Sequence, residues 1–142
     1  MKSHTIHFNL FLFCFLAFSL NAQDKKSPTD SLFQVLKRQN KTSGEYGATC
    51  KAIAQKYMDT YDFARAASYA RKGLTISEKN GIDSLAQQNL LILGLAHIYQ
   101  GNTDSSVIYM KRSTRLALSI KDSSAITRCY GILSNIHNQY LN

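Results

Sequence analysis

Two histidines, His97 and His137, lie forty residues apart and are the first candidates for chemistry. Imidazole is among the commonest metal ligands in proteins. A structural zinc site takes four ligands, however, and the spacing brings no third or fourth ligand to this pair. We therefore expect both rings to fill pockets between helices, and we predict no metal and no cofactor.

Carboxylates, the usual general acids and bases, are few. The chain has nine Asp and Glu residues, and Asp30, Asp83, Asp104 and Asp122 stand where helices are expected to begin, as capping residues do. The sequence contains no Gly-x-Ser-x-Gly, no phosphate-binding glycine loop and no His-Glu-x-x-His. Because no group of residues has complementary catalytic roles, we predict that the protein is not an enzyme.

The formal net charge is +8, which permits acidic proteins, anionic headgroups or nucleic acid as partners. The pairs Arg71-Lys72 and Lys111-Arg112 recur at the same forty-residue spacing and predict a basic ladder on one side of the molecule. A docking surface for an acidic partner is one interpretation of this ladder. We favour a solvated outer face, as charged helix faces usually are.

The first 22 residues have the order of a secretion signal. Lys2 begins a weakly basic segment, an apolar run covers residues 10–18, and polar residues follow Ala22. The run is shorter than the roughly 20 residues that a membrane-spanning helix needs. We predict a signal peptide over 1–22, export to the periplasm or beyond, and no membrane span after cleavage. An uncleaved N-terminal anchor is the alternative.

The rest of the chain repeats itself at a shift of forty positions. Residues 53–57 fall on 93–97, and these fall on 133–137. Residues that fall on one another keep their character: each of these segments begins with an aliphatic residue and ends with a ring, at Tyr57, His97 and His137. The apolar columns recur at three and four residues, so they share one face of a helix.

Polar breaks separate these helical segments. At Asn80-Gly81 and Gly101-Asn102 a glycine can take the left-handed conformation that ends a helix. No segment shows the alternation of a strand. We predict an all-α fold of about six helices, near residues 29–40, 45–59, 63–79, 83–100, 104–120 and 123–140. The predicted organisation is a signal peptide (1–22), a linker with a capping helix (23–44), and an array of two full repeats plus one helix of a third (45–142).

The columns resemble the tetratricopeptide repeat (TPR), whose first helix carries Leu-Gly with a ring four residues after the Leu, and whose second helix carries small residues. Here Leu93-Gly94 supplies the first pattern, with His97 in place of the family's usual Tyr, and Ala66 and Ala70 supply the second. The period departs from the family's usual value of about 34, and the closing Pro is missing. The chain resembles the long-period, exported bacterial arrays of this family. This resemblance implies a TPR-like α-solenoid of helical hairpins.

Two cysteines, Cys50 and Cys129, follow the predicted signal. An exported chain meets an oxidising environment, but a disulfide needs Cα atoms within about 7 Å. Because these cysteines lie about two repeats apart, we expect two separate thiols that pack as small hydrophobic groups.

In the family that this chain resembles, the first helix of each unit lines an inner, concave face. The resemblance places the following side chains there: Lys51, Gln55, Met58, Gln88, Leu91, Leu95, Ile98, Tyr99, Arg128, Asn135, Asn138 and Gln139. An apolar middle with polar flanks suits a peptide that has an apolar anchor and acidic or amide neighbours. For Leu91, Leu95 and Ile98 the favoured interpretation is plain core, because apolar residues at helical spacing usually mean core.

These observations predict a non-enzymatic module that binds a protein or peptide partner. The alternative is the input domain, or a fragment, of a signal-transduction protein such as a histidine kinase or transcriptional regulator, which a neighbouring gene for the output domain would favour. A nucleic-acid adaptor would require that the N-terminal segment is not a signal, and we expect no nucleic-acid partner.

The last predicted helix carries an apolar stripe, and two interpretations of it stay open. The helix either caps the array or leaves the stripe exposed, which would favour a homo-oligomer through this helix. The stripe consists of Ile126, Tyr130, Leu133, Ile136 and Tyr140.

Overall fold

The computed structural model describes residues 28–140 and contains six helices and no strand in that part of the chain. The helices are α2 (Pro28–Arg38), α3 (Gly44–Asp59), α4 (Phe63–Lys79), α5 (Asp83–Tyr99), α6 (Thr103–Ser119) and α7 (Ser123–Tyr140). The predicted all-α fold is confirmed, with helix ends within two residues of the predicted ones. The predicted signal peptide, 1–22, lies outside the described residues. None of the helices described has both the length and the apolar character that crossing a membrane requires.

Four turns between consecutive helices share one geometry, and this explains the regular spacing. Each has one residue with φ between 57° and 75°, namely Tyr61, Gly81, Gly101 or Lys121. In each turn the residue that follows donates its N–H to the carbonyl oxygen five residues before it, as Asn102 does to His97 at 2.9 Å. This is the Schellman arrangement that closes a helix. Because it recurs every twenty residues, helices begin at positions 63, 83, 103 and 123.

The helix caps differ in part from those expected. Asn102, and not Asp104, caps α6, because its side chain accepts a hydrogen bond from the N–H of Ser105. At α5 the capping position is Ile82, which has no side-chain bond to offer. The carboxylate of Asp122 caps α7 as expected.

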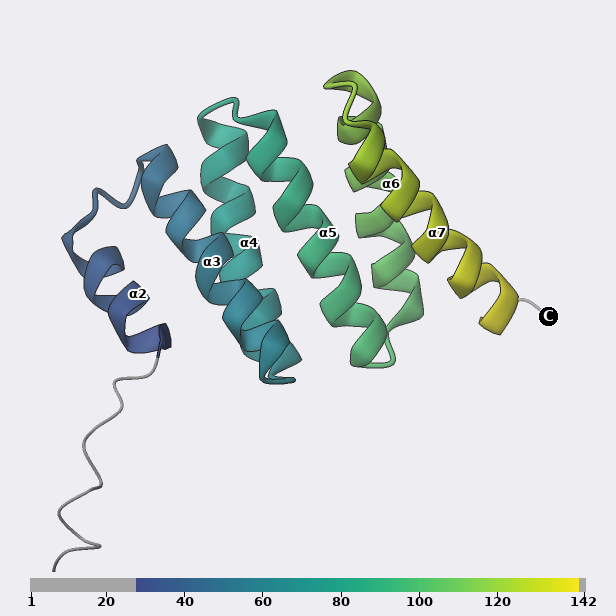
Figure 1. The fold of residues 1–142 in the computed structure, drawn as a ribbon, viewed down its shortest axis with the longest axis horizontal. Coiled ribbons are helices and arrows are strands. Elements are labelled where there is room, and N and C mark those ends of the chain that lie inside the picture. Colours follow the sequence, from purple (N-terminus) through teal and green to yellow (C-terminus); the bar gives the residue numbers. More distant parts are fainter. Residues whose placement is uncertain (1–27, 141–142) are drawn as a thin grey trace, which may run out of the picture.

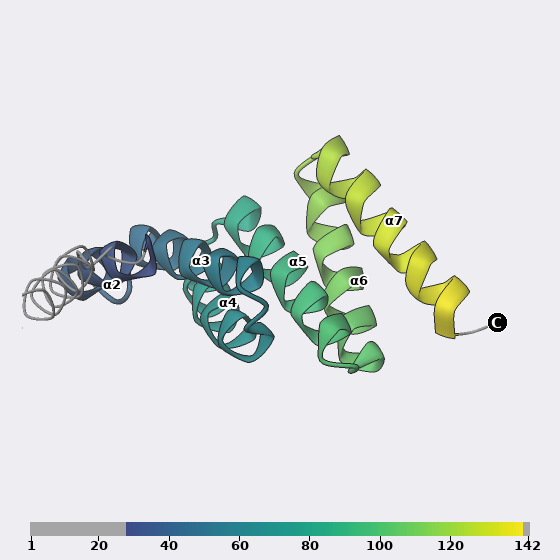
Figure 2. The same cartoon turned by 60° about the horizontal axis from the view of Figure 1, so that its bottom comes forward.

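The helices form an array that runs from α2 at one end to α7 at the other (Figure 1), and the turned view shows the same order (Figure 2). The pairs α3–α4 and α5–α6 are hairpins, with α4 packed on α5 and α7 on α6. In Figure 1, α3, α5 and α7 lie on the near side, with α4 and α6 behind α3 and α7. The predicted sequence of helical hairpins is therefore present, and α2 packs on α3 at one end.

Two apolar clusters fill the spaces between the helices. The larger joins α3, α4 and α5 through residues such as Ala54, Ala70 and Leu93, each fully buried. The smaller joins α5, α6 and α7 through Leu91, Met110 and Cys129. Small side chains allow the hairpin backbones to approach closely, which is the role that the repeated small columns predict.

The cysteines lie in separate places. Cys50 and Cys129 are both free and fully buried, and the Sγ atom of Cys129 lies 3.4 Å from the Oγ atom of Ser113 on α6. The prediction of two separate, packed thiols is confirmed.

The last helix uses a different face from the expected stripe. Ala125, Cys129 and Ile136 are the buried residues of α7, and Ile136 is only 4% exposed. Tyr130, at 53%, is the one residue of the described stripe that is exposed, while Ile126 and Leu133 are half-buried. The interpretation in which the whole stripe is exposed is therefore wrong at Ile136, whose side chain is buried in the array.

Candidate functional site

A cleft of about 430 Å³ lies on the face that α3 and α5 share, with α2 and α7 contributing at its two sides. Its walls consist of Leu32, Lys51, Ala52, Gln55, Lys56, Gln88, Leu91, Ile92 and Arg128. The volume falls within the range of about 300–1,000 Å³ that is usual for ligand sites. It is the strongest candidate for the inner binding face that the resemblance implies.

Helix periodicity places these side chains together. Lys51 and Gln55 lie one turn apart on α3, and Gln88 and Leu91 lie three residues apart on α5, so each helix presents one stripe to the cleft. Arg128 occupies, on α7, the position that Gln88 occupies on α5, forty residues earlier. The repeat thus brings residues distant in sequence to one surface.

The rim of the cleft is polar and positively charged. Lys51 donates from Nζ to the Oε1 atom of Gln88 at 2.9 Å, which ties α3 to α5. Lys56 lies 3.5 Å from the carboxylate of Asp59, in an exposed pair. Arg128 makes no ion pair with any residue that the structure describes. Since no Asp or Glu is part of the described lining, the rim favours an anionic or hydrogen-bonding ligand.

The floor is apolar and buried. Leu91 and Ile92 are 6% and 5% exposed, and Leu32 and Ala52 are half-buried at the sides. Leu91 also belongs to the cluster with Met110, so it serves the core and the cleft at once. An apolar side chain of a ligand could contact this floor while the rim binds the polar groups beside it.

Five of the twelve predicted binding residues therefore line the cleft: Lys51, Gln55, Gln88, Leu91 and Arg128. The other seven lie elsewhere. Met58 and Leu95 pack against the two apolar clusters, and the ring of Tyr99 stacks on that of Phe63 at 4.7 Å. Ile98 is half-buried outside the lining. The other predicted residues of α7, which are exposed but not part of the lining, are Asn135, Asn138 and Gln139.

Four lining residues were not predicted: Leu32, Ala52, Lys56 and Ile92. Ala52 and Ile92 occupy the same column of the repeat, one residue after the Lys51 column. This shared position in the repeat could have indicated that both residues line the cleft. Positions three and four residues apart lie on one stripe of a helix, which also includes Lys56, four residues after Ala52. The repeat has no equivalent of α2, so nothing in its pattern indicates a contribution from Leu32.

His97 is half-buried in a structural environment, whereas His137 is exposed, so the expectation that both rings fill pockets is wrong for His137. The rings of His97 and Tyr109 stack at a centroid distance of 5.3 Å and an angle of 10°, and neither ring nitrogen has a hydrogen-bond partner in the described part of the chain. Burial lowers the pKa of His97, and the nearby Arg71 lowers it further. A neutral ring that fills space between α5 and α6 accounts for these observations.

The fold defines an all-α protein built from repeated helical hairpins. Comparisons with protein-family models, with curated proteins and with solved structures each give no match.

Proposed function

We propose that the protein is an exported, non-enzymatic interaction module of the TPR type, which binds an acidic or amide-rich peptide with one apolar anchor. One observation carries this proposal: three cations surround a cleft with an apolar floor and no described carboxylate in its lining. The cations are Lys51, Lys56 and Arg128. Two amides, Gln55 and Gln88, stand between them and offer both donors and acceptors to a peptide backbone.

The expected affinity is moderate. Burial of one anchor side chain contributes about 1.5–3 kcal/mol, and a hydrogen bond to a charged group contributes about 1.5–3 kcal/mol. Ordering a flexible peptide opposes these terms. A dissociation constant in the micromolar range is therefore expected, with strong weakening by salt because the rim is exposed.

Fluorescence anisotropy with three labelled peptides tests the proposal. The first is an acidic peptide with a central Leu, the second has Asn and Gln in place of Asp and Glu, and the third has Ser in place of Leu. We expect the first to bind at least about tenfold more tightly than either of the others. Equal binding of all three would show that the cleft does not select the proposed ligand.

Arg128→Met separates this cleft from general charge. Arg128 is exposed and has no described ion-pair partner, so its replacement should leave the fold intact. The affinity for the acidic peptide should fall about tenfold. Arg115→Met on α6 is the matched control, because Arg115 is exposed and does not line the cleft. An equal loss in both variants would indicate attraction to net charge and not recognition in the cleft.

Export is a separate part of the proposal. The order of residues 1–22 supports it, and the test is to express the full chain with its natural start and determine the N-terminus of the purified protein. Cleavage after Ala22 would leave Gln23 as the first residue. A protein that keeps Met1 and fractionates with membranes would support the uncleaved anchor.

A further inference from the structure

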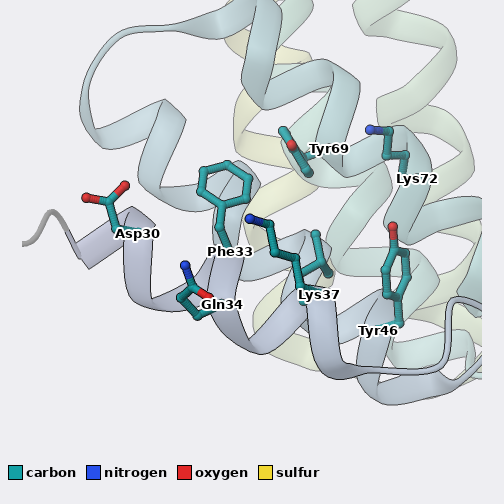
Figure 3. A pocket seen from close by; sticks show the side chains of 8 residues that line it. Asp30, Phe33, Gln34, Lys37, Tyr46, Tyr69 and Lys72 are labelled. Atoms are coloured by element: carbon teal, nitrogen blue, oxygen red, sulfur yellow. The ribbon is translucent and has the colours of Figure 1, made fainter.

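A second cleft, of about 660 Å³, lies between α2 and the α3–α4 hairpin. Its walls consist of Asp30, Phe33, Gln34, Leu36, Lys37, Tyr46, Tyr69 and Lys72 (Figure 3). None of these residues lines the first cleft, on the face shared by α3 and α5, which we call the inner cleft. The volume again suits a small molecule, and the proposed peptide-binding function does not use this site.

The charge of this second cleft is unbalanced. Lys37 on α2 and Lys72 on α4 have no carboxylate partner among the residues described. The Nζ atom of Lys72 lies 4.6 Å from the centre of the Tyr69 ring, a cation–π contact that holds the ammonium in place. Asp30 is the one carboxylate of the lining, and it lies across the cleft from Lys72 and Tyr46 (Figure 3).

Two phenols add neutral hydrogen-bond donors. Burial raises the pKa of Tyr46, and the neighbouring Cys50 raises it further. Burial also raises the pKa of Tyr69, with Tyr57 as the next contribution. Both hydroxyls therefore stay protonated at neutral pH, and each has a proton to donate to an anion, that of Tyr46 by turning away from the Cys50 thiol. Tyr46 and Lys72 stand on the same side of the cleft (Figure 3).

Phe33 and Leu36 add an apolar surface on the α2 side of the wall, beside Asp30 and Gln34. The ring of Phe33 meets that of Tyr69 edge to face, with centroids 5.7 Å apart, and Leu36 stands one helical turn further along α2. Phe33 and Leu36 are both half-buried. A ligand that entered here would therefore contact an apolar surface at one end and donors at the other.

We propose that this second cleft binds the oxyanion, carboxylate or phosphate, of a small organic anion whose apolar part contacts Phe33 and Leu36. Lys72 and Lys37 supply the positive charge, and the hydroxyls of Tyr46 and Tyr69 donate hydrogen bonds to the oxyanion. Hydrogen bonds between an ammonium and an oxyanion are stronger than neutral ones. The position of Lys72 over a ring reduces the ordering that binding must impose.

Titration of the full-length protein with benzoate, phenyl phosphate and benzamide, followed by NMR, tests this proposal. Benzamide has the ring and nearly the shape of benzoate but no charge. We expect benzoate or phenyl phosphate to bind at low-millimolar concentration or below, with benzamide at least about tenfold weaker. The tighter of the two anions identifies the carboxylate or the phosphate as the preferred group. Absence of binding by both anions, or equal binding of benzamide, would overturn the proposal.

Variants locate the binding. Lys72→Met keeps the apolar stem that lies on Tyr69, and Tyr46→Phe keeps the ring but loses the hydroxyl, so both should fold. Each should lower the affinity for the tighter-binding anion about tenfold. Lys79→Met, at the exposed end of the same helix as Lys72, should leave this affinity unchanged. If Lys72→Met leaves the affinity unchanged, or if Lys79→Met weakens binding as much, the anion does not bind in this cleft.

Discussion

The contact between Gly94 and Met110 determines how closely α5 and α6 approach each other. A Cβ atom placed on Gly94 would lie 2.5 Å from the Cε atom of Met110 and 3.0 Å from its Cγ atom. Met110 is fully buried, so its side chain has little room to move. In the first hairpin the equivalent positions are Ala54 and Ala70, both fully buried. The repeat therefore fills the same space either with Gly and Met or with two Ala residues.

This complementarity predicts that the two positions are energetically coupled. Gly94→Ala should gain about 1 kcal/mol in helix propensity and lose about 1–3 kcal/mol by overpacking, a net loss of about 1 kcal/mol. Met110→Ala should lose about 2–5 kcal/mol because it leaves a cavity. The double variant reproduces the Ala54–Ala70 pair, so it should be more stable than the sum of the single losses implies, by about 1–2 kcal/mol.

Urea unfolding followed by the helical circular dichroism signal measures all four proteins in this cycle. Equal slopes of free energy against urea would show that the compared transition is the same. A coupling energy smaller than about 0.5 kcal/mol would be ordinary additivity. That result would refute the reasoning, since it would mean that Met110 moves aside without cost when a methyl group is added at Gly94.

Three further predictions follow from single positions. Lys121→Gly should raise the free energy of unfolding by about 1 kcal/mol, because Lys121 has φ of 57°. Gly81→Ala, in a turn with open space around it, should lower the free energy of unfolding by a similar amount. Thermal unfolding of both variants compares the two effects. The folded-state pKa of His97 is lowered from its usual 6.5 by burial. The unfolded chain therefore binds the proton more readily, and stability should fall as pH drops from 6.5 through the folded-state pKa; a His97→Phe variant with the same acid loss would contradict this origin. Cys50 and Cys129, both fully buried, should react with a thiol reagent only as fast as the protein unfolds, and fast labelling in the native state would be inconsistent with the fold.

The helices could be predicted from sequence because their ends are spaced regularly. Glycines at positions 81 and 101 mark two of the four turns, and the forty-residue repeat supplies the rest. The left-handed residues of the other two turns, Tyr61 and Lys121, carry no such mark. There the hydrogen bonds that close the turn hold a backbone conformation that local preference disfavours. The cap at Asn102 was missed for a related reason, since several polar residues compete for the position and only the turn geometry selects one.

The candidate cleft could be predicted only in part, because α5 is apolar on nearly all sides. It lies between α4 and α6, and a helix buried on two sides has a weak amphipathic signal. Its periodicity therefore does not show which residues face the groove. Leu91 lines the cleft. Leu95, four residues later, is absent from the lining and packs against the smaller apolar cluster, between α5, α6 and α7. Exposed polar positions such as Gln55 and Gln88 were better guides, since nothing in the core competes for them.

Both clefts depend on α2, and this dependence leads to a last prediction. Adjacent residues of α2 face different sites: Leu32 lines the inner cleft and Phe33 lines the second. The helix packs chiefly on α3, and the ring contact between Phe33 and Tyr69 also ties it to α4. Phe33→Ala should loosen α2, and because Phe33 is only half-buried the loss should be smaller than the about 3–5 kcal/mol of a fully buried Phe. The inner cleft would then lose Leu32.

We therefore expect Phe33→Ala to weaken the acidic peptide as well as the organic anion, although Phe33 does not touch the inner cleft. Gln34→Ala is the matched control, because Gln34 is exposed on the same helix and replacing it should leave peptide binding unchanged. Unchanged peptide affinity in Phe33→Ala would mean that α3, α5 and α7 form the inner cleft without help from α2. A joint loss would make α2 the structural element that shapes both clefts, so that any ligand that displaced it from one would alter the other.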